Sequence, residues 1–278
     1  MIHEEFCWNS SDGLRLFGQF WKPEHETKAV VCLVHGLGEH SGRYKILPVC
    51  LANAGYALIA FDQRGHGKSD GKRGHTPSYE HLMDDITTFL HQTEKRFPGK
   101  PLFLYGHSMG GNLVLNYALR YKPALKGVIV TGPWLKLKNP PGRVKFRFAG
   151  LMDLLWPEYT SRNGLKSSDL SHVENMNPEK DEYIHPWITA RTFMGVHKAG
   201  EYAMKNASEF SYPLLLMHGG SDNVTHPEAS RVFASCIDGN CTLKIWDDLY
   251  HEIHNEPRNN EIFAMMTGWL DSQLTGCS

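Results

Sequence analysis

The sequence lacks any long hydrophobic run and any clear excess of charge. No stretch approaches the ~20 consecutive apolar residues that span a bilayer. The opening residues, MIHEEFCWNS, have neither the basic start nor the apolar run of a secretory signal. With 29 Lys and Arg against 30 Asp and Glu, the formal net charge is -1, which gives no broad attraction for phosphate backbones or anionic lipid. We therefore expect a cytoplasmic protein without a nucleic-acid partner.

Cysteine is also scarce, and the six cysteines are scattered with no CxxC pair. Free thiols are therefore expected rather than a disulfide framework, and only Cys236 and Cys241 are close enough along the chain to pair. Metal-ligand spacing is missing too. The run HEIH from His251 resembles H-E-x-x-H, but that motif would place its second histidine at Asn255. No metal site is predicted.

Short apolar runs alternate with segments of helical period along most of the chain. This alternation is typical of an α/β fold with a mostly parallel central sheet flanked by helices. At 278 residues the chain is long enough for one large core, so we expect a single domain over residues 1–278. The six runs of strand length are AVVCLVHG from Ala29, YALIAFD from Tyr56, PLFLYGHS from Pro101, LKGVIVTG from Leu125, PLLLMHGG from Pro213 and CTLKIWDD from Cys241.

Two segments depart from this alternation. From about His3 to Lys22, two strand-like runs flank the turn-rich NSSDG, which predicts an antiparallel hairpin at the edge of the sheet. In residues 133–208, prolines, tryptophans and short helical patterns replace the strands, and we interpret this segment as an inserted helical cap. Outside it, the apolar spacing predicts one helix around residues 82–90 and a closing helix over about residues 257–273.

A G-x-S-x-G motif runs from Gly106 to Gly110, between a buried strand and the helical pattern GNLVLNYALR. On such a sharp turn the serine backbone is strained, and side chains at the flanking positions would collide with neighbouring backbone. The motif in this context predicts an α/β-hydrolase fold with Ser108 as the nucleophile, its hydroxyl presented at the C-terminal edge of the sheet. In the alternative interpretation, Ser108 only caps the helix that follows.

A serine hydroxyl needs a base to remove its proton, and the base needs a third group to orient it. In this fold the carboxylate and the histidine follow the serine in that order, on loops after late strands. Asp222 comes just after the run PLLLMHGG, and His251 lies between the last predicted strand and the closing helix. We therefore assign Asp222 as the acid and His251 as the base.

Because the chain has sixteen histidines, position has to distinguish the base from the others. His254, three residues further on, is the alternative base. Asp247 and Asp248 are alternative acids, although they precede the histidine so closely that they would compete for its own loop. His35 and His218 end strands, and we expect them to brace loops by hydrogen bonds.

The tetrahedral intermediate of ester cleavage carries an oxyanion, which this fold stabilises with two backbone N–H groups. One belongs to the residue after the nucleophile, Met109. The other belongs to a loop after an early strand, and in His35-Gly36-Leu37-Gly38 the glycines let the backbone turn the Leu37 N–H inward. Leu37 and Met109 are thus the predicted oxyanion donors, and a plain glycine turn is the alternative for the first.

Three motifs together resemble the monoacylglycerol lipase and lysophospholipase branch of the α/β hydrolases. They are HGLGEHSGRY from His35, FDQRGHGKSDG from Phe61 and GHSMGG from Gly106, and the GSD and YHEIHNE segments complete the likeness. The resemblance spans nearly the whole chain. It implies the same triad and the same oxyanion residues as those assigned above.

The resemblance also implies a set of substrate contacts. The family uses the EHSGRY stretch beside its site, so Glu39 and Arg43 would lie near the glycerol moiety of a bound substrate, with His254 as a further polar contact. Each of these residues has an alternative role as a structural ion pair or a loop anchor.

The predicted cap contains an amphipathic helix. The sequence VKFRFAGLMDLLW places Val144, Phe148, Leu151 and Leu155 at helical spacing, with basic residues among them. If this apolar face is open, it would form an acyl-chain tunnel and touch membrane surfaces, making the protein peripheral to membranes. In the alternative, the face packs on the hydrolase core.

These assignments predict a serine hydrolase of carboxylic esters of lipids that cleaves monoacylglycerol to a fatty acid and glycerol. Ser108 attacks the carbonyl, His251 passes the proton to the leaving alcohol, and water hydrolyses the acyl-enzyme, so no cofactor is required. A lysophospholipase or a general carboxylesterase with the same triad is the alternative. A further alternative is a non-catalytic binding protein, although its usual sign is a lost triad member and none is missing here.

Overall fold

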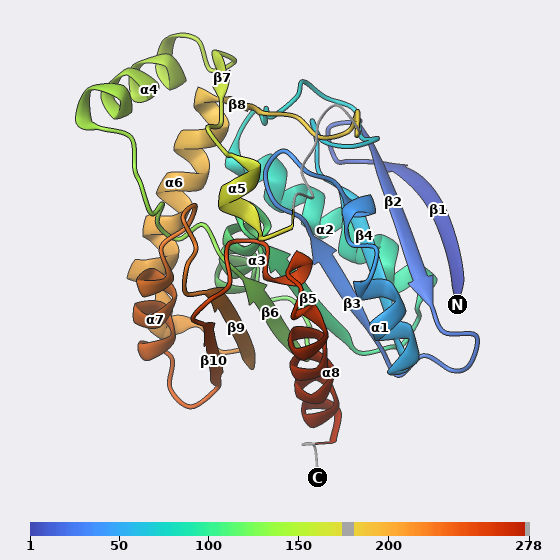
Figure 1. The fold of residues 1–278 in the computed structure, drawn as a ribbon. Helices are drawn as coiled ribbons and strands as arrows, with labels where there is room; N and C mark the ends of the chain where they lie inside the picture. The colour runs from blue at the N-terminus through green and yellow to red at the C-terminus, as the bar shows by residue number, and fades with distance from the viewer. Residues whose placement is uncertain (174–180, 276–278) are drawn as a thin grey trace.

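The centre of the molecule is an eight-stranded sheet (Figure 1), seen in a computed structural model that describes residues 1–173 and 181–275. The strand order is β1-β2-β4-β3-β5-β6-β9-β10; the pairs β1–β2 and β2–β4 are antiparallel, and every other pair in this sheet is parallel. The mostly parallel sheet and its N-terminal antiparallel hairpin are both confirmed. The strands are β1 (Ile2–Asn9), β2 (Arg15–Lys22), β3 (Ala29–Val34), β4 (Tyr56–Asp62), β5 (Leu102–His107), β6 (Gly127–Thr131), β9 (Leu214–Gly219) and β10 (Cys241–Trp246), with β7 (Thr160–Arg162) and β8 (Trp187–Thr189) forming a separate pair.

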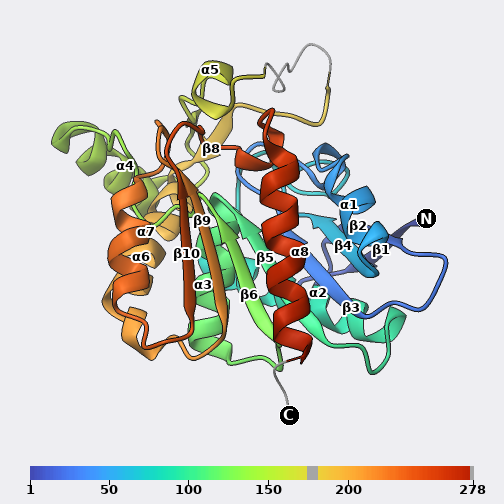
Figure 2. The same cartoon turned by 60° about the horizontal axis from the view of Figure 1, so that its bottom comes forward.

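Helices cover both faces of this sheet. The helices α1 and α8 lie on one face, as Figure 2 shows, and side chains of α2, α3, α6 and α7 pack on the other. No helix in the described part of the chain is both long and apolar enough to cross a bilayer. The helices are α1 (Leu47–Asn53), α2 (Tyr79–Arg96), α3 (Met109–Tyr121), α4 (Arg143–Leu155), α5 (Ser167–Leu170), α6 (Ala190–Lys205), α7 (Pro227–Ser235) and α8 (Asn259–Thr275), with short 3-10 turns η1 (Ser41–Arg43), η2 (Ala207–Glu209) and η3 (Ile253–Asn255).

Burial on both faces explains why the central strands are unbroken apolar runs. In β3, side chains at alternate positions from Ala29 to Leu33 join the cluster under α1 and α8. The positions between them, from Val30 to Val34, join the cluster under α2 and α3. Because successive side chains of a strand point to opposite faces, a strand covered on both sides needs apolar residues at every position.

The segment predicted as a cap, residues 133–208, divides into two parts. Its last helix, α6, packs on α3 of the core, where Asn112 and Asn116 donate side-chain hydrogen bonds to the carbonyls of Val196 and Ala199 at 3.1 and 3.0 Å. By contrast, α4 has no buried residue and stands away from the sheet (Figure 1). The single domain with an inserted cap stays a prediction, and α6 belongs with the core layer rather than with the projecting part.

The thiols in the described residues are free. Cys7, Cys32, Cys50, Cys236 and Cys241 form no disulfide, so the predicted absence of a framework is confirmed for these five and Cys236 does not pair with Cys241. Cys277 lies outside the described residues.

Candidate active site

Ser108 occupies a strained turn between β5 and α3. Its φ of 54° and ψ of -116° fall where residues with a side chain are rarely found. A Cβ on Gly106 would overlap the carbonyl of Gly110, and one on Gly110 would overlap the carbonyl of Val34 in β3. The glycines on both sides of the turn are therefore required by backbone contact, as the motif predicts.

The structure brings Ser108, His251 and Asp222 together from three distant parts of the chain. The Ser108 Oγ lies 2.8 Å from the Nε2 of His251, and the Nδ1 of the same ring lies 2.6 Å from the Oδ2 of Asp222. With the Nδ1–H donating to the carboxylate, Nε2 is free to accept the serine proton. This is the arrangement that a nucleophile, its base and the orienting acid require.

The alternative base and acid lie elsewhere. His254 stacks on Tyr44 with 4.6 Å between ring centroids and meets His107 edge-on at 4.7 Å. Asp248 forms an exposed ion pair with Arg258 at 3.1 Å. Neither His254 nor Asp248 contacts the Ser108 hydroxyl, whereas His251 contacts it directly and is hydrogen-bonded in turn to Asp222.

The Asp222 carboxylate accepts hydrogen bonds from several groups whose contact with it was not predicted from the sequence. Its Oδ1 accepts the N–H groups of Val224 and Thr225 at 2.7 and 2.9 Å. Its Oδ2 accepts the Thr225 hydroxyl at 2.8 Å and the His218 Nε2–H at 3.0 Å. His218 braces this loop as expected, because its Nδ1 accepts the Ser230 hydroxyl at 2.8 Å. The only sequence signal for Thr225 is its place three residues after the acid.

Burial and hydrogen bonding set the charges of this relay. Burial alone would raise the pKa of Asp222, but the neighbouring His251 and the hydrogen bonds from His218 and His251 hold that pKa well below its ordinary value. Burial likewise acts to lower the pKa of His251, and the Asp222 carboxylate outweighs it, so the pKa of His251 is raised above 6.5. The acid therefore stays ionised, and the ring has the basicity of a general base near neutral pH.

The two predicted oxyanion donors flank the nucleophile. A Cβ placed on Gly36 would lie 3.2 Å from the Ser108 Cβ, so the loop that carries Leu37 is packed against the serine. Met109 is the first residue of α3, directly after the nucleophile. Within the described residues, no protein acceptor takes the N–H of Leu37 or Met109. Both donors are thus available to a bound oxygen atom.

Ser108 opens on a cavity of about 970 Å³ rather than on bulk solvent. The serine is 8% exposed, and the cavity runs from it between α4, α6 and the β7–β8 pair. Its wall is mainly apolar, with Trp134, Phe148, Ile188 and Phe193 among the lining side chains. Small-molecule sites of about 300–1,000 Å³ bury most of a ligand's surface, so the cavity has room for a long acyl chain.

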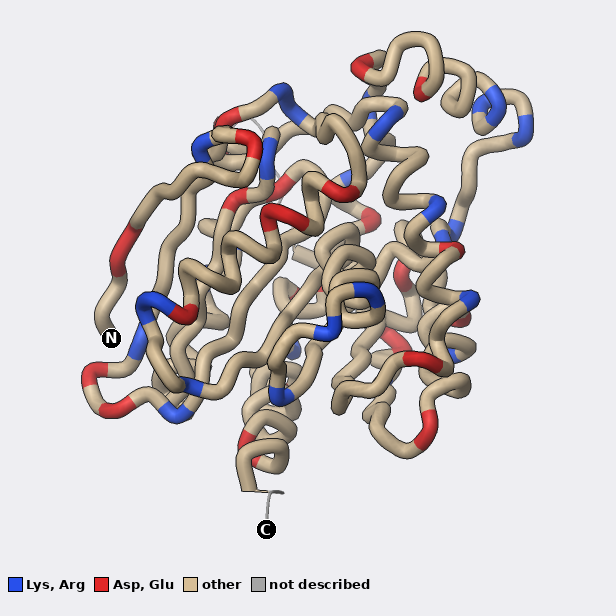
Figure 3. Tube along the Cα trace, turned by 180° about the vertical axis from the view of Figure 1, so that it is seen from behind, with Lys and Arg blue, Asp and Glu red and all other residues tan. Residues whose placement is uncertain are grey.

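Three cations line the same cavity, and no aspartate or glutamate of the described chain does. They are Arg143 and Lys145 of α4 and Arg162 of β7, all exposed. Figure 3 shows the basic residues of α4 at its top right. None of the three has an ion-pair partner among the described residues. The cavity therefore presents uncompensated positive charge to an incoming molecule.

Glu39 and Arg43 are held in a buried ion-pair network and do not line the cavity. Arg43 donates to Glu39 at 3.0 Å and bridges both carboxylate oxygens of Glu252 at 2.8 and 2.9 Å. Glu39 also accepts the Gly36 N–H at 2.5 Å and the Tyr44 hydroxyl at 3.0 Å. This geometry favours the loop-anchor interpretation, and the contact of Glu39, Arg43 and His254 with glycerol stays a prediction.

The described residues include no group of three or more His, Cys, Asp or Glu that could hold a metal ion. The chemistry that the arrangement offers is acyl transfer through a serine nucleophile in a confined, largely apolar chamber.

Comparisons with known proteins agree with this geometry. The family model described as serine aminopeptidase, S33, matches residues 25–258. The chain is 36% identical to an uncharacterised abhydrolase domain-containing protein of Dictyostelium discoideum, over 95% of this chain but only 28% of that protein's length. It is 30% identical to a monoacylglycerol lipase of Mycolicibacterium smegmatis, covering 94% of this chain and 95% of that one. The crystal structure of a Paleococcus ferrophilus monoacylglycerol lipase is similar with a TM-score of 0.83 and 33% identity, over 93% of this chain and 99% of that one.

Proposed function

Because this chain belongs to the serine aminopeptidase S33 family of hydrolases, we propose that it cleaves the ester bond of monoacylglycerols to give a fatty acid and glycerol. The observation that carries the proposal is the Ser108–His251–Asp222 relay at the end of a mainly apolar cavity. The names of the Mycolicibacterium and Paleococcus relatives supply the substrate class.

In the proposed reaction the acyl group passes through the enzyme in two steps. Ser108 Oγ attacks the ester carbonyl while His251 Nε2 takes the hydroxyl proton, and the protonated ring then gives that proton to the leaving glycerol oxygen. Water, deprotonated by His251, attacks the acyl-enzyme, and the ring returns that proton to Ser108 Oγ as the bond to the acyl carbon breaks and the fatty acid leaves. Asp222 stabilises the imidazolium in both steps and keeps Nδ1 as the donor. Its buried hydrogen bonds from Thr225 and His218 support this role.

The oxyanion of each tetrahedral intermediate is assigned to the N–H groups of Leu37 and Met109. Such donors act on charge that develops only in the transition state, and removing one typically costs about 10²–10³ in kcat. The close packing of the Gly36 loop on Ser108 supports this assignment for Leu37.

A second candidate substrate is a lysophospholipid with an anionic headgroup. The observation that favours it is the set of three unpaired cations along the cavity, Arg143, Lys145 and Arg162. A phosphate on the glycerol would find charge partners there, whereas neutral glycerol would gain little from them. Ester cleavage by the same relay would serve both substrates.

The α4 helix is assigned as a contact with lipid surfaces. Its exposed apolar side chains include Val144 (82% exposed), Leu154 (76%) and Leu155 (67%), next to an exposed Trp156. An apolar face of this size flanked by basic residues is typical of helices that lie in a membrane interface. Such a contact would present the cavity to the membrane in which monoacylglycerols dissolve.

Substrate profiling of the purified protein tests these assignments. Monoacylglycerols, lysophospholipids with the same acyl chain and p-nitrophenyl esters are compared by kcat/KM, with Ser108→Ala as the control. We expect turnover of monoacylglycerols and labelling by a fluorophosphonate probe, both abolished in Ser108→Ala. Folded wild-type protein that neither turns over these esters nor takes the label would instead be a binding scaffold.

A further inference from the structure

Residues 185–189, which directly precede α6, are hydrogen-bonded to two loops of the core, one that contains Gly38 and one that contains Gly65 and Gly74. The N–H of His185 donates to the carbonyl of Gly38 at 3.0 Å, and the N–H of Thr189 donates to that of Gly74 at 3.1 Å. Gly38 has a φ of +78°, and a Cβ on it would overlap the His185 carbonyl. The loop that carries Leu37 is thus fitted closely to the backbone of His185.

The His185 side chain contacts the loop that contains Gly65 and Gly74. It is 5% exposed, its Nε2–H donates to the carbonyl of Gly65 at 3.1 Å, and its Nδ1 accepts the N–H of Trp187 at 3.3 Å. The ring lies on that of His66, with 4.6 Å between centroids. Burial lowers the pKa of His185 to about 4, so the ring is neutral and holds one tautomer near pH 7.

A second histidine contact continues from His66 to the loop of Leu37. His66 meets His35 edge-on with 5.3 Å between centroids. His35 donates its Nδ1–H to the carbonyl of Gly36 at 2.7 Å and accepts the Gln63 N–H on Nε2 at 3.0 Å. The Gly36 carbonyl and the Leu37 N–H belong to one trans peptide plane and point in opposite directions. Holding that carbonyl on His35 therefore aims the Leu37 N–H away from His35.

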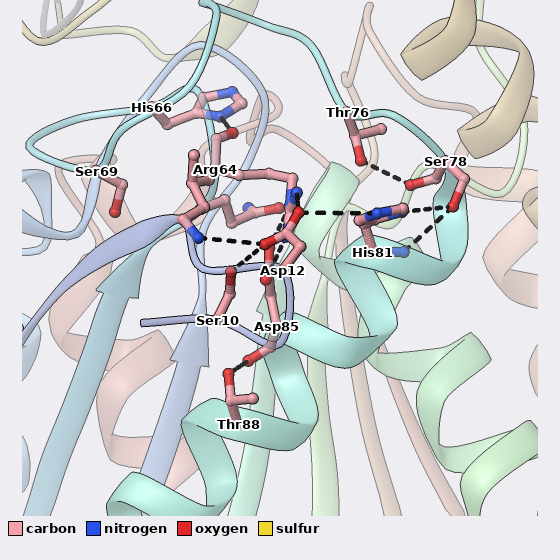
Figure 4. Close-up of polar contacts among 12 residues, drawn as sticks. Ser10, Asp12, Arg64, His66, Ser69, Thr76, Ser78, His81, Asp85 and Thr88 are labelled. Carbon is pink, nitrogen blue, oxygen red and sulfur yellow. Dashed lines mark hydrogen bonds and ion pairs between the residues drawn. The ribbon is translucent and has the colours of Figure 1, made fainter. Parts of the chain in front are cut away.

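The turn that carries His66 is fixed to helix α2 (Figure 4). Arg64 donates to both carboxylate oxygens of Asp85 at 2.6 and 2.7 Å and to Asp12 at 2.8 Å. The carbonyl of Arg64 accepts the Nδ1–H of His66 at 3.0 Å. A buried bidentate pair of this kind leaves the turn at Arg64 and Gly65 little freedom to move.

We propose that His185 is a positioning residue for the oxyanion donor Leu37. Its backbone N–H holds Gly38 on one side of Leu37. Its ring, anchored on Gly65, packs against His66, and His66 packs edge-on against the His35 ring that holds the Gly36 carbonyl on the other side. The inference rests on the proposed function, because it presumes that the Leu37 N–H stabilises an oxyanion. It implies that the Leu37 N–H stabilises the transition state only while the backbone and ring of His185 keep these contacts.

A matched pair of variants tests the role of the ring. In His185→Gln the terminal amide extends to the place of Nε2 and retains a donor for Gly65. In His185→Asn the amide ends near the place of Nδ1, so it keeps the Trp187 contact and loses Gly65. On a soluble ester such as p-nitrophenyl hexanoate, we expect His185→Asn to lower kcat about tenfold with KM changed less than about twofold. His185→Gln should stay within about threefold of the wild type.

An inhibitor pair separates positioning from a general structural role. A trifluoromethyl ketone forms a hemiketal oxyanion on Ser108, whereas a methyl ketone of the same chain length mainly occupies the cavity. His185→Asn should weaken inhibition by the trifluoromethyl ketone by about the factor lost in kcat and leave that by the methyl ketone unchanged.

The control is His75→Leu, which removes a 3.0 Å hydrogen bond to the Thr189 hydroxyl on the same stretch without touching the Leu37 loop. It should keep kcat within about twofold. If the asparagine variant does not fold, as judged by thermal unfolding, His185→Phe supplies the comparison, since it keeps a ring on His66 but lacks the N–H.

Three results would overturn the inference: an unchanged kcat in His185→Asn, an equal loss in His75→Leu, or a loss carried entirely by KM. The proposed function is tested separately in the same assay, because it fails only if the wild type itself does not turn over the ester.

Discussion

Asp222 and His251 are joined by a 2.6 Å hydrogen bond between Oδ2 and Nδ1, and both side chains are almost fully withdrawn from water. The bond fixes which ring nitrogen carries the proton. It also makes the charge of one residue depend on that of the other. The effect of replacing Asp222 and the pH dependence of the rate both follow from this pair.

Replacing Asp222 by Asn should lower kcat by about 10⁴, because the amide can hold the ring in the wrong tautomer while the geometry stays intact. Initial rates on a soluble ester, with thermal unfolding to verify the fold, measure the effect. Asp248→Asn is the control, since Asp248 pairs with Arg258 at the surface. Equal losses in the two variants would mean that Asp222 is not the acid.

The rate should depend on pH through His251. Only the neutral ring can accept the serine proton, and its pKa is raised above 6.5. A raised pKa keeps the ring protonated to higher pH, so kcat/KM should fall as the pH drops below a midpoint that lies above 6.5. A profile of kcat/KM between pH 5 and 9 measures it. A midpoint below 6.5 would contradict the raised pKa of His251.

The exposed face of α4 should matter at a lipid surface and not in solution. Burying a leucine side chain contributes roughly 1.5–3 kcal/mol, so the double variant Leu154→Glu, Leu155→Glu should lower vesicle binding at least about tenfold. Hydrolysis of a soluble ester should be unchanged, because neither leucine lines the cavity. Co-sedimentation with vesicles measures binding, and Val232→Glu on α7, a site 43% exposed, is the control. Equal binding by the double variant and the wild type would remove α4 from the membrane contact.

Gly110→Ala should destabilise the fold, because the new methyl group would overlap the Val34 carbonyl of the neighbouring strand. Overpacking of this kind typically costs about 1–3 kcal/mol. Gly268→Ala is the opposite case: it lies in α8 with open space around it, and should gain about 0.5–1 kcal/mol. Urea unfolding of both variants gives the comparison, and an unchanged midpoint for Gly110→Ala would contradict it.

Arg43→Met should also be costly, since it leaves the buried carboxylates of Glu39 and Glu252 without their cationic partner. Breaking such a buried pair costs about 3–5 kcal/mol. Arg258→Met, which removes two exposed ion pairs, should leave the unfolding midpoint nearly unchanged. A stable Arg43→Met protein with a raised KM for monoacylglycerol alone would instead indicate that Arg43 contacts substrate.

The parts of the molecule that could be predicted are those where local pattern and fold geometry coincide. The central strands follow from unbroken apolar runs, and Ser108 follows from the glycines that its turn requires. The convergence of Asp222 and His251 on Ser108 could be predicted because the carboxyl ends of parallel strands meet at one edge of the sheet. The α/β-hydrolase fold and the resemblance to the monoacylglycerol lipase branch are both confirmed by the relatives and solved structures.

The parts that could not be predicted depend on partners far away in the sequence. Arg43 meets Glu252 across 209 positions, and nothing local to either residue signals that pair. Helix α6 lies within the expected cap, yet the amides of Asn112 and Asn116 bind it to the core. Amphipathic spacing shows that a helix has an apolar face but not which surface will cover it.

Because α4 has no buried side chain, its residues can be substituted more freely than those of the core. A helix with no fully buried residue can exchange most of its exposed residues without lowering the melting temperature of the sheet below it. Because several of those residues also form the wall of the chamber above Ser108, substrate range and thermal tolerance are separable traits in this chain. A combinatorial library confined to Arg143–Leu155 is therefore the natural starting point for redirecting it to new esters.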